Sequence, residues 1–392
     1  MQILVKIFQK IILLICFWLW MSVAYGAEAI RVGTSTALSG PSSSLGQDMK
    51  IGLETYFRKV NDKGGIYARK IELVALDDGY IPEVAKTNMI RLIERENVLA
   101  VIGNVGTPTA RVTVPIANQK KTLLFGAFTG SDLLRKDPPD RYVINYRASY
   151  ADETENIIHG LMKMVIRPFE IAFFTQNDSY GDAGYQGALK ALEGLGYTKG
   201  RGLPHGRYER NTSDIKEALI KILNAEIKPR AVIMIGSYAP CAKFISIAKR
   251  VLPNALFLNV SFVGSNALMR TLGKNGEGVI ISQVVPGPAA ELPVVREYKE
   301  DLKEYFPDVE QGFVSLEGYI VAKIFIEGLR RIRGEINREN IITALESIKN
   351  FDVGLNVPLT YSPTEHSGIT AVWPVIIRNG KFQPFNWTNA GK

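Results

Sequence analysis

Two loops of the sequence carry the residue types that bind an anion. In residues 103–108, Gly-Asn-Val-Gly-Thr-Pro, Thr107 takes the N-cap position of an expected helix and Pro108 its first helical position. Residues 126–131, Gly-Ala-Phe-Thr-Gly-Ser, repeat this arrangement after the next apolar run. Backbone N–H groups at a helix start point outward and favour a negatively charged group. The loops therefore predict an anion site, although ordinary turns and helix caps would give the same pattern.

The spacing of the reactive side chains does not indicate an enzyme. The sequence has no phosphate-binding P-loop and no Gly-x-Ser-x-Gly elbow, and the glycines of residues 194–200 lack the spacing of a dinucleotide-binding loop. His159, His205 and His366 lie far apart, without the spacing of metal ligands. We therefore expect a non-enzymatic protein with no metal, no cofactor and no catalytic residues.

The apolar patterns that must position these loops alternate between strands and helices. In the first part of the chain we expect strands at residues 30–34, 71–76, 99–102 and 123–125 and helices at residues 48–60, 84–94 and 108–119. After a polar stretch near residues 145–153, we expect strands at residues 170–175, 231–235 and 256–260 and helices at residues 157–164, 183–195 and 241–251. A strand at residues 278–284, helices at 294–305 and 316–331, and a hairpin at 371–382 around Asn379-Gly380 follow.

Two separate series of alternating elements predict an α/β protein with two doubly wound lobes, each built on a parallel sheet covered on both faces. Ligands of such sheets bind in the crevice beyond the carboxyl ends of the strands. Both anion loops follow an expected strand. We therefore expect both loops to lie in such a crevice.

The first 26 residues have the order of a secretory signal peptide. Lys6 and Lys10 precede an apolar run at residues 11–20, and small residues follow at Ala24 and Gly26. The run is shorter than the stretch of about 20 apolar residues that spans a bilayer. We expect cleavage after Gly26, a periplasmic product and no stable membrane insertion of the mature chain; an uncleaved anchor is the alternative.

The charge and the cysteines exclude two further classes of protein. The formal net charge is +8, but basic residues are mixed with acidic ones, so no basic stripe indicates a nucleic-acid partner. Once residues 1–26 are removed, Cys241 is the only cysteine, and no intramolecular disulfide can form. Cys241 lies near an expected helix start, where a reactive thiolate is favoured, yet a small buried residue is the better interpretation.

Three stretches resemble the amino-terminal signature of a known family. They are residues 38–46, which begin Leu-Ser-Gly-Pro and end Leu-Gly, residues 60–66, Val-Asn-Asp-Lys-Gly-Gly-Ile, and residues 69–74, Arg-Lys-Ile-Glu-Leu-Val. The family is that of the type I periplasmic solute-binding proteins of the leucine/isoleucine/valine-binding class. The resemblance extends over essentially the whole mature chain. It implies a first lobe of residues 27–146 plus 286–354, a second lobe of residues 147–285 plus 355–392, three crossovers, and closure of a hinge around the ligand in a cleft between the two lobes.

The resemblance also implies which residues bind the ligand. The family positions that hold a ligand carboxylate are matched by Thr107 and by the Ala127-Phe128-Thr129 unit. Hydroxyl and backbone N–H groups at helix starts can neutralise an anion without a full positive charge. The family's tyrosines of the second lobe are matched by Tyr180 and Tyr238.

At two positions the chain departs from the family's pattern. Leu45 replaces an aromatic residue, and Asn266 stands where an acidic residue pairs with the ammonium group of an amino acid. A neutral amide cannot replace that charge. We therefore expect simple carboxylates to compete well with leucine, isoleucine and valine, unless Asp152, Glu153 or Glu317 supplies the missing charge.

The function implied is that of a receptor for an ABC transporter. We expect a monomer that encloses a small amino acid or carboxylate and presents its closed form to the permease subunits. A ligand-sensing module of the same fold, reporting to a signalling partner, is the alternative. Neighbouring genes for permeases and ATPases would favour transport, whereas a neighbouring kinase or chemoreceptor would favour sensing.

Overall fold

The computed structural model of the chain describes residues 28–388, so the expected signal peptide lies outside the described residues. The first sheet is parallel and has the strand order β2–β1–β3–β4–β5. Its strands are β1 (Ile30–Thr36), β2 (Ile71–Asp77), β3 (Ala100–Ile102), β4 (Leu123–Phe125) and β5 (Val143–Ile144). This order is that of a doubly wound sheet, whose ligand site lies where the order reverses, next to β1 and β3.

The second sheet has seven strands in the order β14–β13–β10–β9–β8–β6–β7. They are β6 (Ile171–Gln176), β7 (His205–Tyr208), β8 (Ala231–Ile235), β9 (Leu256–Asn259), β10 (Ile280–Ile281), β13 (Val375–Arg378) and β14 (Lys381–Pro384). The last two form an antiparallel hairpin at one edge. Asn379 and Gly380 at its turn have φ of 50° and 68°, which confirms the predicted Asn-Gly turn.

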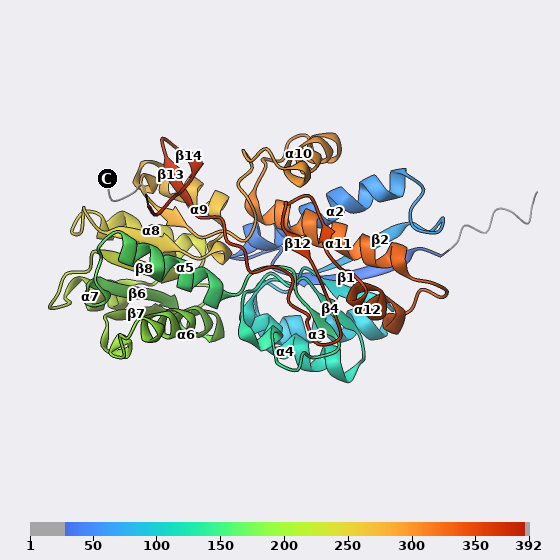
Figure 1. Cartoon of the computed structure of the whole chain (residues 1–392), viewed down its shortest axis with the longest axis horizontal. Helices are drawn as coiled ribbons and strands as arrows, with labels where there is room; N and C mark the ends of the chain where they lie inside the picture. Colours follow the sequence, from blue (N-terminus) through green and yellow to red (C-terminus); the bar gives the residue numbers. More distant parts are fainter. Residues whose placement is uncertain (1–27, 389–392) are drawn as a thin grey trace, which may run out of the picture.

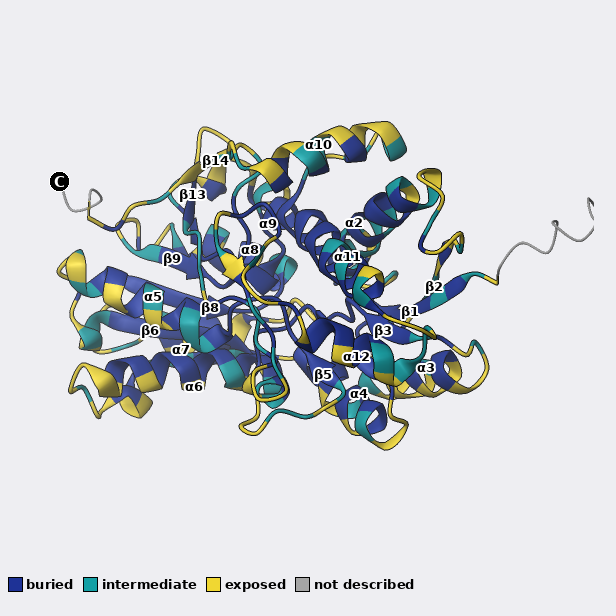
Figure 2. Ribbon diagram, turned by 45° about the vertical axis from the view of Figure 1, so that its right-hand side comes forward, coloured by how far each residue is buried: buried dark blue, intermediate teal, exposed yellow. Residues whose placement is uncertain are grey.

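The helices cover both faces of the two sheets, as Figures 1 and 2 show. Those that follow first-sheet strands are α2 (Ser43–Asp62), α3 (Pro82–Glu94) and α4 (Thr107–Gln119). Those among the second-sheet strands are α5 (Tyr150–Lys163), α6 (Ser179–Gly194), α7 (Lys216–Leu223), α8 (Tyr238–Ala248) and α9 (Ser265–Leu272). The inner strands are dark in Figure 2 because they are buried, whereas the edge strands β2 and β14 are mostly intermediate or exposed and the helices turn their exposed residues outward.

Three helices late in the chain return to the first sheet. They are α10 (Pro293–Tyr305), α11 (Phe313–Arg331) and α12 (Arg338–Glu346). Both α10 and α11 pack on α2, and α12 packs on α11. Figure 1 shows these orange and red helices beside the blue first segment of the chain. A short hairpin of β11 (Phe351–Asp352) and β12 (Pro358–Leu359) follows them.

The chain passes between the two sheets three times. The passages lie between β5 and β6, between β10 and α10, and between β12 and β13. Two backbone hydrogen bonds join the first and third passages, from Asn145 N to His366 O at 2.8 Å and from Ile369 N to Tyr146 O at 2.9 Å. The bond from Trp373 N to Gln283 O, at 2.8 Å, joins the third passage to the second. The passages therefore run side by side.

The largest difference from the predicted elements is at the first passage. The helix expected at residues 157–164 begins at Tyr150, because the preceding polar residues form a capping box. Ser149 Oγ accepts from Asp152 N at 3.0 Å, and Asp152 Oδ2 accepts from Ser149 N at 2.7 Å. The strand expected at residues 278–284 is reduced to Ile280–Ile281. The sequence patterns did not predict β5, β7, α7, α9 or α12.

Candidate functional site

Two threonine hydroxyls meet where the strands of the first sheet end. Thr107 Oγ1 and Thr129 Oγ1 are 2.7 Å apart, and both residues are buried. The prediction that Thr107 caps its helix is wrong, since Gly106 takes the N-cap position with φ of 104°. The ring of Tyr80 occupies the space that a Cβ atom on Gly106 would need, so only glycine fits there. The Thr107 hydroxyl is therefore free to reach Thr129.

Aromatic rings from both sheets pack together beside these hydroxyls. The ring of Phe128, which precedes Thr129, lies 5.2 Å from the ring of Phe262 in the short helix η4 (Ser261–Val263). Phe262 lies 4.4 Å from Tyr180 at the start of α6, and Tyr180 lies 5.3 Å from Tyr150. The structure thus brings Phe128, Thr129 and Tyr180 into one region and adds Tyr150 and Phe262.

The other predicted site residues lie around this region in different settings. Leu45 and Tyr238 both lie against Gly264, where an added Cβ would be 2.6 Å from Leu45 Cδ2 and 3.4 Å from Tyr238 Cδ1. The two side chains therefore approach Gly264 from helices that cover different sheets. Ala127 packs with the buried apolar residues of α3 and α4. Its side chain belongs to the core of the first sheet.

The side-chain amide of Asn266 contacts the loop before α11. Its Nδ2 donates to Gln311 O at 3.0 Å, in the loop before α11. The same loop approaches its Oδ1, which would lie 3.3 Å from a Cβ atom on Gly312. The amide is therefore engaged by the protein's own backbone.

A buried charged group lies next to Phe128, and we call Arg147, Glu153, Ser261 and Glu317 the Arg147 cluster. The side chains of Arg147, Glu153 and Glu317 are 1%, 0% and 2% exposed. Arg147 Nη2 contacts Ser261 Oγ and lies 3.5 Å from Glu153 Oε1, while Arg147 Nη1 lies 3.5 Å from Glu317 Oε1. The guanidinium stacks over the Phe128 ring at 4.6 Å from its centre.

Charge and burial shift the pKa values at this site. Burial raises the pKa of Glu317 to about 7, although the positive charge of Arg147 opposes the shift. Burial also raises the pKa of the Tyr150 hydroxyl, which Arg147 and the hydroxyls of Thr129 and Thr107 lower in part. Tyr150 therefore lies close to both the threonine pair and the guanidinium. The threonine pair and the Arg147 cluster therefore belong to one polar region.

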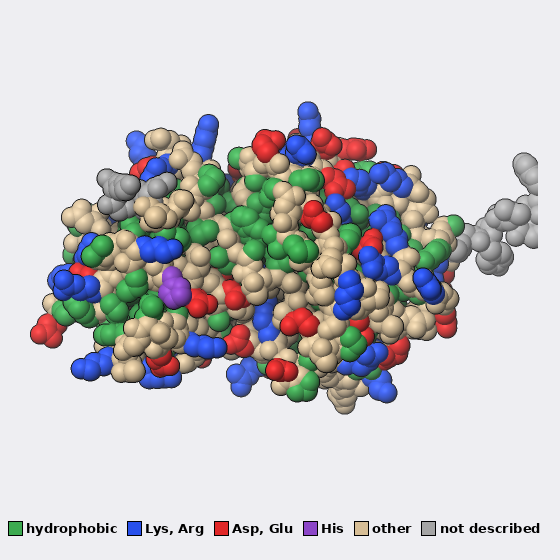
Figure 3. All heavy atoms as spheres, in the orientation of Figure 1, with side chains coloured by type: hydrophobic (Ala, Val, Ile, Leu, Met, Phe, Trp, Pro, Cys, Tyr) green, Lys and Arg blue, Asp and Glu red, His purple; other side chains and the backbone are tan. Residues whose placement is uncertain are grey.

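Direct contacts hold the two halves together near this region. Gln176 Nε2, at the end of β6, donates to the hydroxyl of Tyr80 at 3.3 Å. Asn211 Nδ2 donates to Gly79 O at 3.1 Å, and the guanidinium of Arg210 lies 5.7 Å from the centre of the Tyr80 ring. The facing loops of the two sheets are therefore in contact. Figure 3 shows side chains filling the junction on the face drawn, and acidic and basic residues mixed over that face.

A pocket of about 340 Å³ lies between the start of α4 and α6. It is lined by Thr107, Arg111, Ser131, Asp132, Leu133, Ser179, Asp182, Ala183 and Gln186. The two sides of this pocket come from segments that cover different sheets. It leads to Thr107, one of the paired hydroxyls.

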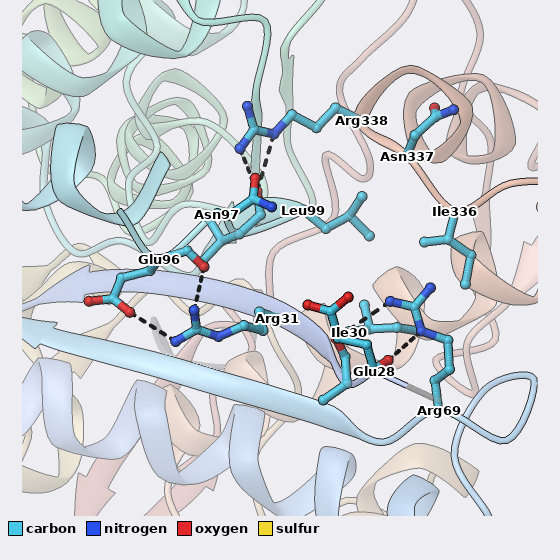
Figure 4. Close-up of a pocket in the computed structure, with 12 residues that line it drawn as sticks. Glu28, Ile30, Arg31, Arg69, Glu96, Asn97, Leu99, Ile336, Asn337 and Arg338 are labelled. Atoms are coloured by element: carbon cyan, nitrogen blue, oxygen red, sulfur yellow. Dashed lines mark hydrogen bonds and ion pairs between the residues drawn. The ribbon is translucent and has the colours of Figure 1, made fainter. Parts of the chain in front are cut away.

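A second pocket, of about 280 Å³, lies at the amino ends of β1 and β3 (Figure 4). Its arginines are already engaged: Arg31 Nη2 lies 2.9 Å from Glu96 Oε2, and Arg338 Nη2 donates to Val98 O at 3.0 Å. Arg69 points to the carbonyl of Glu28. This pocket is therefore a less suitable ligand site than the region around Thr107.

Within residues 28–388, no group of His, Cys, Asp and Glu side chains is arranged to hold a metal ion. Cys241 is buried, and burial raises the pKa of its thiol, which confirms its interpretation as a packing residue. His205 packs on Tyr185 with ring centres 4.1 Å apart, and His366 is buried against Glu346. In the same part of the chain, every helix is too short or too polar to cross a membrane.

Comparison with known proteins agrees with this architecture. The family described as periplasmic binding protein matches residues 29–381. The Leu/Ile/Val-binding protein homolog 7 of Brucella abortus is 25% identical over 330 residues, which are 78% of each chain.

Among solved structures, a possible leucine/isoleucine/valine-binding protein from Rhodopirellula baltica is 47% identical, with a TM-score of 0.90 over 93% of this chain and 98% of that one. A substrate-binding periplasmic protein from Ralstonia solanacearum is 25% identical, with a TM-score of 0.82 over 91% of this chain and all of that one.

Proposed function

The chain belongs to the periplasmic binding protein family, whose members are non-enzymatic solute-binding proteins that work outside the cytoplasm, and we propose that it is the receptor of an ABC transporter. It encloses a small amino acid or carboxylate between two lobes and presents the closed form to the permease subunits. A sensing module with the same fold would bind its ligand in the same way. The names of two relatives support an amino acid ligand in either case, since one is a Leu/Ile/Val-binding protein homolog and the other a possible leucine/isoleucine/valine-binding protein.

The proposed lobes are residues 27–146 plus 286–354 and residues 147–285 plus 355–392. The first two passages between the sheets support the boundaries near residues 146 and 285, and the hydrogen-bonded segments of all three passages can act together as a hinge. The third passage lies between β12 and β13, after the proposed boundary at residue 354. The packing of α10 and α11 on α2 supports the return of residues 286–354 to the first lobe.

The proposed ligand-binding residues come from helices and loops that follow strands of the two sheets. They are Leu45, Thr107, Ala127, Phe128, Thr129, Tyr180, Tyr238 and Asn266. The observation that carries the proposal is the buried pair of hydroxyls of Thr107 and Thr129, which lies beside aromatic rings from both sheets. Hydroxyl groups at this position can donate to a ligand carboxylate, and the rings can surround its apolar part.

Ligand binding can be tested on the mature chain by thermal unfolding with amino acids and small carboxylates. A ligand that binds only the folded protein raises the melting temperature in a concentration-dependent way. Calorimetry on each compound that does so gives its Kd. If no amino acid and no small carboxylate stabilises the protein, the proposed function is wrong.

Thr129→Ala is expected to weaken ligand binding by roughly 1.5 to 3 kcal/mol, because a hydrogen bond to a charged group is lost. Calorimetry with the best ligand of the screen measures the change. Thr129→Ser is the matched control, since it keeps the hydroxyl, and should bind nearly as tightly as the unchanged protein. Equal affinity of Thr129→Ala and the unchanged protein would remove Thr129 from the site.

Export is expected to remove residues 1–26, because the apolar run at residues 11–20 is too short to serve as an anchor. Amino-terminal sequencing of protein from the periplasmic fraction should begin at Ala27. Recovery of the chain only in the membrane fraction, with Met1 retained, would contradict cleavage.

A further inference from the structure

The Arg147 cluster contains polar atoms that lack hydrogen-bond partners. Within residues 28–388 these are Nε and Nη1 of Arg147 and Oε1 of Glu317. Both residues are at least nine-tenths buried. A buried donor or acceptor without a partner destabilises the folded state, so such a group is a candidate for contact with a ligand.

The two carboxylates of the cluster differ in how well they are satisfied. Glu153 accepts from Ser261 N at 2.7 Å and from Ser261 Oγ at 2.9 Å, and it lies beside Arg147 Nη2. Both carboxylates lie 3.5 Å from the guanidinium, which is long for a hydrogen bond, and Glu317 Oε1 has no other partner. Glu153 is therefore satisfied by Ser261, whereas Glu317 retains the capacity to bind another group.

The cluster joins the two halves of the protein. Arg147 lies on the first passage between the sheets, Ser261 follows β9 of the second sheet, and Glu317 lies on α11, which packs on the first-sheet side. The guanidinium stacks on Phe128, the neighbour of Thr129 in the chain. A ligand carboxylate at the Thr129 hydroxyl would thus lie near the unpaired donors of Arg147.

We propose that Arg147 and Glu317 select a zwitterionic ligand, with the guanidinium binding its carboxylate and Glu317 binding its ammonium group. This inference rests on the proposed function, because it concerns the same site. The ligand replaces one long ion pair by two shorter ones and adds no net charge to the buried cluster. It brings acceptors to the free donors of Arg147 and a donor to Glu317 Oε1.

The same charges exclude the two simpler ligand classes. An amine without a carboxylate would leave the free donors of Arg147 without an acceptor, and a carboxylate without an ammonium group would add a third negative charge to Glu153 and Glu317, which share the single cation Arg147. Burying an uncompensated charge is costly. Asn266 is not the ammonium partner in this proposal, since its amide is engaged by Gln311. Glu317 supplies the charge that Asn266 lacks.

The test uses calorimetry on the mature chain with leucine, isoleucine, valine, threonine and alanine, and with the deaminated acid and the decarboxylated amine of each. We expect at least one amino acid to bind roughly tenfold or more tightly than its own acid and its own amine. If an acid binds as tightly as its amino acid, the inference is overturned while the proposed function stands. If no compound binds, both are overturned for this ligand class.

Three variants then assign the roles. Glu317→Gln should lower the affinity for the amino acid by roughly 10- to 100-fold and leave that for the acid unchanged or higher. Arg147→Lys should lower both affinities, because lysine has no planar fork for a carboxylate. Glu327→Gln is the matched control, since Glu327 lies on the same helix, paired with Arg331, and should change neither.

Equal effects of Glu317→Gln and Glu327→Gln on amino acid binding would overturn the inference. Thermal unfolding without ligand shows whether each variant is still folded. A variant that keeps the melting temperature of the unchanged protein but loses the preference for an amino acid over its acid has lost selectivity and not the fold.

Discussion

Gly52→Ala is expected to lower the free energy of unfolding by about 3 kcal/mol. Gly52 lies where α2 crosses α11, and an added Cβ would be 2.0 Å from Ser315 O and 2.8 Å from Tyr319 N. These are backbone atoms of a buried helix, so they cannot move aside as a flexible side chain could. The two helices would have to separate, and the close packing between them would be lost.

Gly318 makes this crossing tighter still. A Cβ atom there would lie 2.5 Å from Met49 O, so each helix places a glycine against the backbone of the other. Urea unfolding followed by circular dichroism measures the loss. Gly194→Ala is the control: Gly194 is the last residue of α6, and an added Cβ would meet nothing within 4 Å. That variant should be unchanged or more stable by up to about 1 kcal/mol, and equal stability of both variants would contradict this account.

The alternation of strands and helices could be predicted because it depends on local patterns of residues. The β-rich run of β1, the apolar runs of β4 and β8 and the spacing of apolar residues in α2 and α11 each lie within one element. The Asn379-Gly380 turn is also local, since asparagine and glycine are the residue types that most readily adopt the positive φ that this turn requires. Two such series in one chain were enough to predict two doubly wound lobes.

The elements that escaped prediction have weak local signals. β5 and β7 are short, and their place in the sheets depends on pairing with β4 and β6. α5 begins earlier than expected because its polar first turn is stabilised by Ser149 and Asp152, a pattern easily taken for a loop. In these cases the tertiary structure or a side-chain cap determines the boundary.

The threonine pair could be predicted in part, and Glu153 and Glu317 were candidates for the missing charge, but their meeting with Arg147 and Ser261 could not be predicted. Loops after strands and the resemblance to the family both indicated Thr107 and Thr129. Ser261 lies 114 residues after Arg147 in the chain, and Glu317 lies 56 residues after Ser261. The three side chains meet only because three passages bring the sheets together. One local signal existed: Glu317 is a lone carboxylate in the buried, mostly apolar first part of α11.

Glu317→Gln is expected to raise the free energy of unfolding at pH 8, by up to about 3 kcal/mol, in the absence of ligand. The pKa of Glu317 is raised from 4.5 to about 7 in the folded protein, mainly by burial. At pH 8 the charged carboxylate is therefore less favourable in the folded state than in the unfolded one. Glutamine has the same shape and carries no charge, so it avoids this cost.

The sign of the pH dependence follows from proton release. Between pH of about 4.5 and 7 the folded protein keeps a proton on Glu317 that the unfolded chain has lost, so this group makes stability fall as pH rises through that window. At pH 4.5 the variant and the unchanged protein should therefore be nearly equal. Burial lowers the pKa of His205 to about 4 and acts in the opposite direction, but equally in both proteins.

The competing effect is the loss of an ion pair with Arg147. Removing one partner of a buried pair is usually destabilising by about 3 to 5 kcal/mol, because the other charge is left alone. Arg147 is not left alone here, since it keeps Ser261 and keeps Glu153 at the same 3.5 Å separation that it has from Glu317. Arg135 and Tyr146 also face Glu317, and only the first of these is a cation that favours its charge. We therefore expect the cost of burial to prevail.

Urea unfolding of both proteins at pH 4.5, 6, 7 and 8 measures the difference. The gap should open between pH of about 4.5 and 7, reach about half its full size near pH 6 and favour the variant, while Glu327→Gln follows the unchanged protein at every pH. If the variant is the more stable of the two, Glu317 lowers the stability of the unchanged protein, as expected of a buried residue that serves to select the ligand. If Glu317→Gln is instead less stable at pH 8 than at pH 4.5 relative to the unchanged protein, Glu317 serves to neutralise Arg147 and is not available to a ligand.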